Sequence, residues 1–221
     1  MKISRFLLKI LTICLGIAVI FGPNQKVEGA KQATPEEIEN ISKAIPEGIT
    51  PRKKHKVLVF SKAFTYYHSS IAVAKEMARQ MGEKTGLFET DFTNDPKDLS
   101  AENLKNYDAV YLNNSTSIEK GLTTEKMRKE FLEYVRNGGG IVAIHAATDG
   151  GWPGYTEMIG GNFDGHPWGH NGTYCLCNED PNHSVVKGIF DGNRSFKIND
   201  ELYQYKDFER EKVRVLLSID M

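Results

Sequence analysis

Cysteine is scarce in this chain of 221 residues, which has three. Outside the N-terminal apolar segment only Cys175 and Cys177 remain, in "TYCLCNE". A C-x-C spacing closes too tight a loop for an easy bridge, and no four-ligand zinc pattern is present, so the sequence is not that of a disulfide scaffold. Alternate residues of a strand point to the same face, and we expect both cysteines to be small, half-buried strand residues.

The chain also has no excess of positive charge, because its 28 basic and 29 acidic residues give a formal net charge of −1. It falls to −4 if residues 1–29 are removed, since they hold four basic residues and one acidic one. The remaining basic run, "PRKKHK" (Pro51–Lys56), directly precedes an apolar strand and is expected to be a solvated lead-in. Nucleic acid is therefore an improbable partner, since binding it requires a basic patch.

No apolar run is long enough to span a bilayer, which takes roughly 18–20 residues. The run from Ile10 to Gly22 is shorter, follows a basic start and is followed by the small residues Gly29 and Ala30. This pattern predicts a cleaved signal peptide over residues 1–29, export to the periplasm or beyond, and no stable membrane span after cleavage.

The rest of the chain predicts a linker followed by one domain. Residues 30–55 contain prolines and alternating charge and predict a linker with a helical turn or two. From Lys56 onward, long apolar strands alternate with amphipathic helices, without internal repeats. This order predicts an α/β fold with a doubly wound, mostly parallel sheet and helices on both faces. The predicted strands are 56–61, 87–92, 107–114 and 140–145, and the predicted helices cover 71–81 and 127–135.

Two histidines follow predicted strands, at the edge where open α/β sheets bind ligands. His68 lies in the loop after the first strand, and His145 ends the fourth within "GGGIVAIHAATDGGW". The placement of His145 resembles a nucleophile elbow, but neither serine nor cysteine occupies the tip. The sequence therefore disfavours an acyl-enzyme hydrolase.

A second group of polar residues comes later in the chain. His166 and His170 flank Trp168, but Pro167 and Gly169 prevent the helix of an H-E-x-x-H zinc site. Trp168 is a suitable ring for stacking on a sugar. In "NDELYQY", the acidic residues Asp200 and Glu201 precede an aromatic pair.

Five segments in series resemble the ThuA-like (trehalose-utilisation) family over about Lys56 to Ile219. The specific features are G-G-G-x-x-x-x-H-A-A-x-D, F-x-G-H-P and D-E-L-Y in this order. The segments are "VFSKAFTYYHSS", "YDAVYLNN", "FLEYVRNGGGIVAIHAATD", "YTEMIGGNFDGHP" and "DELYQY".

The resemblance implies the flavodoxin-like fold of class I glutamine amidotransferases. Amidotransferase activity is not implied, because His145 stands where those enzymes carry cysteine. It also implies a role in bacterial use of trehalose and related sugars, often through keto-sugar intermediates, and export. The family usually continues past "VRVLLSID" into a tryptophan-containing segment and a G-R-x-x-Y-x-x-x-G-H-like motif, so we expect the domain at residues 56–221 to be truncated at its C-terminus. The motif positions carried over are His68, His145, Asp149, His166, Asp200 and Glu201.

Two kinds of enzyme chemistry remain open, with an isomerase, lyase or hydrolase of sugars or keto-sugars as the expected class. His145 or His68, with Glu201, could perform general acid/base catalysis, because imidazoles titrate near neutrality. Alternatively His68, His145 and His166 could hold a divalent metal such as zinc that polarises a carbonyl. A glycosidase pair is disfavoured, because the adjacent Asp200 and Glu201 would point oppositely on a strand.

The alternative to an enzyme is a carbohydrate-binding module that uses the same pocket without turnover. Aromatic rings would then stack on sugar faces, and the histidines would donate hydrogen bonds to hydroxyls. The residues expected to contact a carbohydrate in either case are Tyr67, Asp149, Trp152, Trp168 and Asp200, with Tyr66 as a further stacking ring. The sugar, the bond changed and the oligomeric state are left open by the sequence.

Overall fold

The computed structural model describes residues 32–48, 50, 52–169, 171–187, 190 and 193–220. The predicted signal peptide at residues 1–29 and His170 lie outside this range. No helix within the described residues is both long and apolar enough to cross a membrane.

The centre of the fold is a four-stranded sheet in which all pairs are parallel, in the order β2-β1-β3-β4. This is the beginning of the flavodoxin-like order 2-1-3-4-5, so the predicted fold class is confirmed. The apolar runs of the central strands explain why the sequence predicted them to within about two residues. The strands are β1 (His55–Phe60), β2 (Phe88–Thr93), β3 (Ala109–Asn113) and β4 (Gly140–Ile144).

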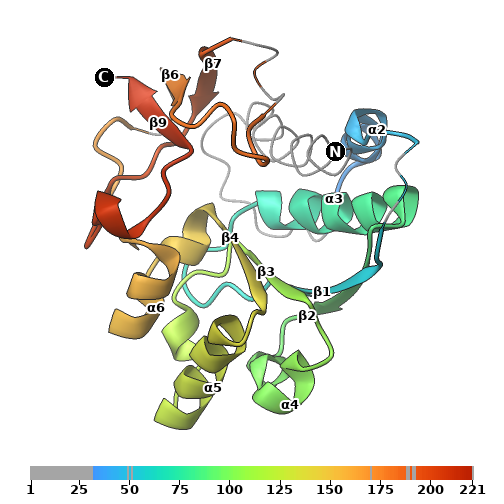
Figure 1. Ribbon diagram of the computed structural model, residues 1–221, viewed down its shortest axis with the longest axis vertical. Helices are drawn as coiled ribbons and strands as arrows, with labels where there is room; N and C mark the ends of the chain where they lie inside the picture. Colours follow the sequence, from blue (N-terminus) through green and yellow to red (C-terminus); the bar gives the residue numbers. More distant parts are fainter. Residues whose placement is uncertain are drawn as a thin grey trace.

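Helices cover both faces of this sheet (Figure 1). Side chains of β1 alternate between the faces: Leu58 and Phe60 lie in the cluster with Phe131 of α5, whereas Val59 packs with Ala78 of α3. The side chains of β1 are therefore buried on both faces of the sheet. One side carries α2 (Pro35–Ala44) and α3 (Ser70–Thr85), and the other carries α4 (Ala101–Leu104), α5 (Glu125–Arg136) and α6 (Pro153–Ile159).

Helix α2 corrects the prediction of a linker over residues 30–55. It has ten residues and begins with a capping box, in which Thr34 and Glu37 each bond the other's backbone N–H. Ile41 and Ile45 are 2% and 3% exposed and pack on α3 against Met77. The prolines suggested a linker, but Pro35 sits in the first turn, where the missing N–H costs nothing.

The second half of the chain adds a small antiparallel sheet in the order β7-β6-β9 and a two-stranded ribbon of β5 and β8. β7 ends at Asp200, whose carboxylate accepts the Glu201 N–H at 2.8 Å. The chain then turns back toward β4. These strands are β5 (Asn162–Phe163), β6 (Gly172–Asn178), β7 (Ser195–Asp200), β8 (Tyr205–Lys206) and β9 (Leu217–Asp220).

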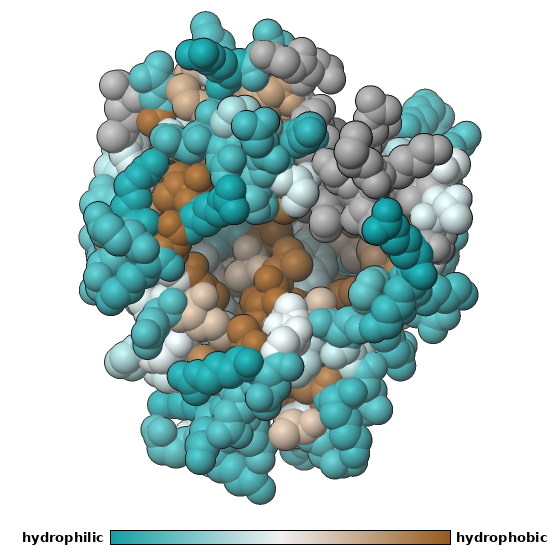
Figure 2. All heavy atoms as spheres, viewed as in Figure 1, coloured by the Kyte–Doolittle hydropathy of each residue, from teal (hydrophilic) through white to brown (hydrophobic). Residues whose placement is uncertain are grey.

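Four short 3₁₀ turns complete the described chain. They are η1 (Pro96–Leu99), η2 (Ile118–Lys120), η3 (His145–Thr148) and η4 (Arg210–Lys212). The face seen in Figure 2 is hollowed at its centre, and hydrophobic side chains are visible on the floor of the hollow.

Candidate functional site

The loops after β1, β3 and β4 are tied together at the carboxyl edge of the parallel sheet. Thr116, after β3, accepts the Phe64 N–H on its backbone oxygen at 3.2 Å and the Thr65 N–H on its hydroxyl at 3.1 Å. Ser117 donates its N–H to the carbonyl of Asp149 at 2.8 Å. This framework holds the segments that carry His68 and His145 in fixed positions.

His145 begins η3 directly after β4 with a φ of +46°. A non-glycine residue in the left-handed region is uncommon, and such backbone strain occurs preferentially at functional sites. The sharp turn has the character of a strand-tip elbow, as the sequence predicted. The ring of His145 lies 4.9 Å from that of His68 and 4.0 Å from that of Tyr203, measured between centroids.

Glu201 lies between two of the predicted histidines. One carboxylate oxygen is 3.1 Å from Nε2 of His145, and the other is 3.5 Å from Nδ1 of His166. The three side chains are about a quarter exposed. An imidazole beside a carboxylate is held in one orientation and is stabilised when it takes up a proton. The arrangement thus suits proton transfer.

Tyr203 connects this group to a buried acid. Its ring packs on His145, His166 and Phe163, at centroid distances of 4.0, 4.9 and 4.2 Å. Its hydroxyl hydrogen-bonds the Asp149 carboxylate. Burial raises the pKa of Asp149 to about 6, although the charge of His145 and the Tyr203 hydrogen bond act in the opposite direction. Oδ1 of Asp149 is buried without a hydrogen-bond partner among the described residues, so it is available to a ligand.

His68 is a neutral group in this site. Burial, and then the neighbouring His145, lowers the pKa of His68 to about 4. An imidazole kept neutral at pH 7 can donate one hydrogen bond to a carbonyl oxygen without bringing a charge. Burial also raises the pKa of Asp200, which lies one residue before Glu201.

The structure therefore brings together His68, His145, His166, Asp149 and Glu201, with Asp200 beside them. Three other predicted residues have different contacts. Tyr67 is 47% exposed, and Trp168 accepts the Tyr174 hydroxyl on its backbone oxygen. The ring of Trp152 packs on Tyr155 and under Arg128.

Trp152 lines an open cavity of about 600 Å³ between α6 and η4, which neither His145 nor Glu201 lines. We place the chemistry at the histidines, because the described lining of this cavity has acidic residues and a lysine but no imidazole. The lining residues are Gly151, Trp152, Pro153, Thr156, Glu157, Gly160, Asn162, Asp207, Glu209, Lys212 and Val213.

Tyr203 and Phe163 were missing from the predicted site, although both contact its histidines. The sequence "ELYQY" contained a signal for Tyr203, because residues two apart in an extended chain share a face and Tyr203 is two residues after Glu201. Asn114 was missed as well: it is buried after β3 with a φ of +51°, and its Oδ1 lacks a partner within the described chain.

The donor types expected for a metal are present, but their positions favour hydrogen bonding. Each oxygen of Glu201 faces a different imidazole. Among the described residues, Cys175, Cys177 and Asp220 form a group whose ligand atoms all lie within 4.8 Å of one another. This group includes no histidine. A metal held by His68, His145 and His166 would require these side chains to move closer together.

Comparison with known proteins gave a family and a structural relative. A search of curated proteins gave no match. The crystal structure of a ThuA-like protein from Bacteroides uniformis ATCC 8492 is 25% identical, with a TM-score of 0.60, over 79% of this chain and 71% of that one. The sequence model of the ThuA family, described as trehalose utilisation, matches residues 56–221. The match includes the strand-tip histidine, the Glu201 loop and the sheet that positions them, and the chain belongs to the ThuA family.

Proposed function

We propose that this protein acts on a sugar or keto-sugar by proton transfer at the His145–Glu201 pair. The observation that supports the proposal most directly is the contact of 3.1 Å between these side chains at a strained strand tip. In this arrangement His145 removes the proton from the carbon next to a carbonyl, and Glu201 stabilises the resulting imidazolium. The electron pair of the broken C–H bond moves to the carbonyl oxygen, which gives an enediolate.

Two further residues complete the proposed site. A neutral His68 donates a hydrogen bond to the carbonyl oxygen, where negative charge develops. Asp149 accepts a hydrogen bond from a sugar hydroxyl at Oδ1. Return of the proton to the former carbonyl carbon, with transfer of the hydroxyl proton from one oxygen to the other, gives isomerisation. Loss of a leaving group from the carbon on the other side of the deprotonated carbon gives elimination.

The test compares His145→Ala with the parent protein on a panel of keto-sugars. We expect turnover to fall about 10²–10⁴-fold, the usual cost of a lost acid or base, with binding largely kept. His55→Ala is a matched control, because His55 lies at the opposite edge of the same sheet, at the start of β1. Full turnover in His145→Ala would contradict the proposal.

A divalent metal at the same residues is a second proposal. Imidazole nitrogens and a carboxylate are ligands that zinc accepts, and the depressed pKa of His68 keeps it deprotonated. When bound, such a metal would polarise the substrate carbonyl. Elemental analysis of untagged protein tests this: a stoichiometric metal that His145→Ala loses supports the idea, and a metal-free, active protein contradicts it.

Binding of carbohydrate without turnover is the alternative, and the exposure of Tyr66 beside His68 favours it. Tyr66 is 64% exposed, and its ring centroid lies 4.7 Å from that of His68 in an edge-to-face arrangement, so its open face could stack on a sugar. In a binding protein, His145→Ala should weaken binding by only about 1–3 kcal/mol. Calorimetric titration with the sugars of the turnover panel separates the two cases.

We propose in addition that the protein is exported after cleavage near Gly29 and Ala30. The support is the basic start and short apolar run of residues 1–29. Sequencing the N-terminus of the protein from a periplasmic or culture fraction tests this proposal, and an intact Met1 in that protein would contradict it.

A further inference from the structure

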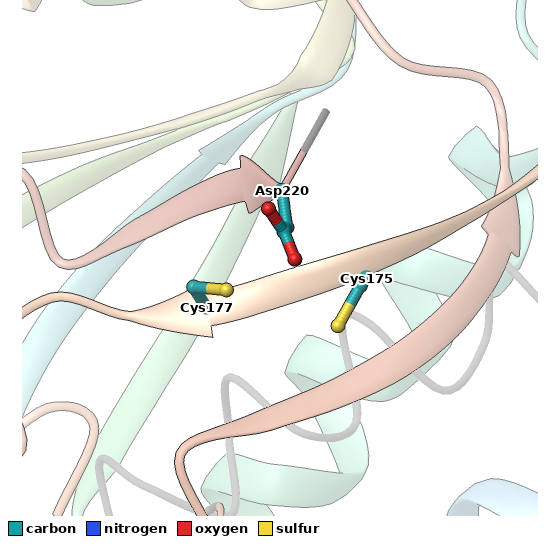
Figure 3. Close-up of side chains that lie close together, drawn as sticks. All are labelled: Cys175, Cys177 and Asp220. Atoms are coloured by element: carbon teal, nitrogen blue, oxygen red, sulfur yellow. The ribbon is translucent and has the colours of Figure 1, made fainter.

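Two thiols and a carboxylate gather on the small antiparallel sheet, outside the histidine site. Figure 3 shows Cys175 and Cys177 on β6 and Asp220 on the neighbouring β9. One ligand atom from each of the three residues lies within 4.8 Å of the other two. Both cysteines are free thiols.

The register of the sheet produces this cluster. Cys175 lies directly opposite Asp220 in the antiparallel pair of β6 and β9. Cys177 is two residues farther along β6 and therefore projects from the same face as Cys175. Directly opposed residues of an antiparallel pair have Cβ atoms only about 4.5–5.5 Å apart, so the backbone alone brings three donors together.

The cysteines do not fill the core of the sheet. Leu176, which lies between them, is buried with 7% exposure, and so is Ile198 of β7 with 4%. Leu176 and Ile198 lie on one face of this sheet, and the half-buried cysteines lie on the other. That second face also carries the exposed Lys197, which lies across from Cys175. Packing in the core thus explains the position of Leu176. It does not explain the two thiols, which lie on the other, more exposed face.

The donor atoms of this face suit a cation. The Asp220 carboxylate lies within 4.8 Å of both thiols, on the side of β6 away from Lys197. A divalent ion between the donors would attract the carboxylate and deprotonate the thiols. Glu179 is close by, but its carboxylate already accepts a hydrogen bond from Ser218 at 2.6 Å and pairs with Arg210 at 3.1 Å.

We propose that Cys175, Cys177 and Asp220 form a binding site for a thiophilic divalent cation of the zinc type. Two thiolates and a carboxylate are ligands that zinc prefers, and three protein ligands leave one tetrahedral position for water. With Zn–S bonds of about 2.3 Å, the two sulfurs of a tetrahedral site lie roughly 3.8 Å apart. Rotation of the half-buried cysteine side chains about their Cα–Cβ bonds would bring the sulfurs to that spacing. The site is independent of the function proposed for the histidines.

Cobalt(II) is the probe for the test, because it reports thiolate ligands by colour. The full chain is used as a Cys14→Ser variant, so that Cys175 and Cys177 are the only thiols present. Reduced, metal-free protein is titrated with Co²⁺ and then with Zn²⁺. We expect a sulfur-to-cobalt charge-transfer band that saturates at one equivalent and disappears when zinc displaces cobalt.

Four variants distinguish this site from the histidine site. Cys175→Ser and Cys177→Ser should each weaken cobalt binding by roughly 10-fold or more, since even outer-shell partners of a metal ligand are worth about 10–100-fold. Asp220→Asn should weaken binding while keeping the band. Glu201→Gln, within the histidine site, should leave the band and the affinity unchanged.

Circular dichroism of each variant confirms that it is folded, so a lost band reports lost ligands. The proposal is overturned by a parent protein without a charge-transfer band at one equivalent of Co²⁺. It is also overturned by a band that survives both serine substitutions. A Cys175–Cys177 disulfide that persists in the presence of reductant and zinc would overturn it as well.

Discussion

His145 and Glu201 are 56 residues apart in the sequence, and their side chains meet at 3.1 Å. One begins η3 after β4, the edge strand of the parallel sheet, and the other follows β7 of the antiparallel sheet. The contact therefore joins the parallel sheet to the antiparallel sheet β7-β6-β9. It places the Glu201 carboxylate beside the imidazole of His145, a residue whose backbone is strained at a φ of +46°.

Replacing Glu201 by glutamine should lower turnover by about 10²-fold or more, while the fold is kept. Glutamine preserves the shape of the side chain but cannot stabilise the imidazolium that His145 becomes. Steady-state kinetics on a keto-sugar substrate measure the effect, with kcat expected to change far more than KM. Glu209→Gln, on the exposed η4 side of the molecule, serves as the control. Equal turnover in Glu201→Gln and parent would remove Glu201 from the mechanism.

The strain at His145 predicts an unusual order of stability between two variants. Glycine adopts a positive φ freely, whereas alanine in the left-handed region costs about 1–2 kcal/mol. His145→Gly should therefore be more stable than His145→Ala by about 1 kcal/mol, although both lack the imidazole and both should be inactive. Urea denaturation of the two variants gives the difference, and an alanine variant that is the more stable of the two would show that the backbone is unstrained.

The protonation of His68 should make the protein less stable in acid. Its pKa is lowered to about 4 from an ordinary value of 6.5, so the unfolded chain binds a proton that the native state refuses. This contribution is absent above about pH 6.5, grows as the pH falls and reaches on the order of 2–3 kcal/mol near pH 4. Asp149→Asn separates the effect of His68 from that of Asp149, which titrates over the same range. The free energy of unfolding of that variant should fall steadily between pH 6.5 and 4.

Asp149 acts in the opposite direction. Its pKa is raised to about 6 from 3.8, so the native state binds a proton before the unfolded chain does, and stability rises as the pH falls through this window. The free energy of unfolding of His68→Gln should consequently rise by up to about 2–3 kcal/mol between pH 6 and 4. In the parent protein the opposite contributions of His68 and Asp149 to this free energy nearly cancel. Denaturant midpoints measured at several pH values decide this, and a His68→Gln variant that weakens in acid would contradict the raised pKa.

The sequence predicted the central strands and the residues at their tips because both signals are local. The run from Val57 to Phe60 is apolar without interruption, and His145 interrupts such a run among glycines. The partner of His145 could not be predicted from spacing, because Glu201 arrives through the turn after β7. That turn depends on the Asp200 side chain and not on strand periodicity.

Tyr203 was missed, and helix α2 was predicted only as a helical turn or two within a linker, for a related reason. Tyr203 is half of an alternating aromatic pair, and only the approach of β5 and η3 decides that its ring meets His166 and its hydroxyl meets Asp149. In α2, short helices have little stability alone, so the prediction depended on a partner surface that the sequence does not display. The Thr34–Glu37 capping box was the local signal that could have revealed the helix.

Helix α2 should contribute measurably to the stability of the whole domain, although it precedes the residues that match the family. Ile41 is 2% exposed and packs against α3, so Ile41→Ala should cost about 2–4 kcal/mol in the free energy of unfolding. Ile38, one turn earlier on the same helix and 38% exposed, gives the matched control: Ile38→Ala should cost less than about 1 kcal/mol. Denaturation followed by far-ultraviolet circular dichroism and by tryptophan fluorescence measures both variants. Coincident transitions in the two probes would show that α2 and the sheet unfold as one unit. If Ile41→Ala were no less stable than Ile38→Ala, the helix would be an appendage to the domain and not part of its core.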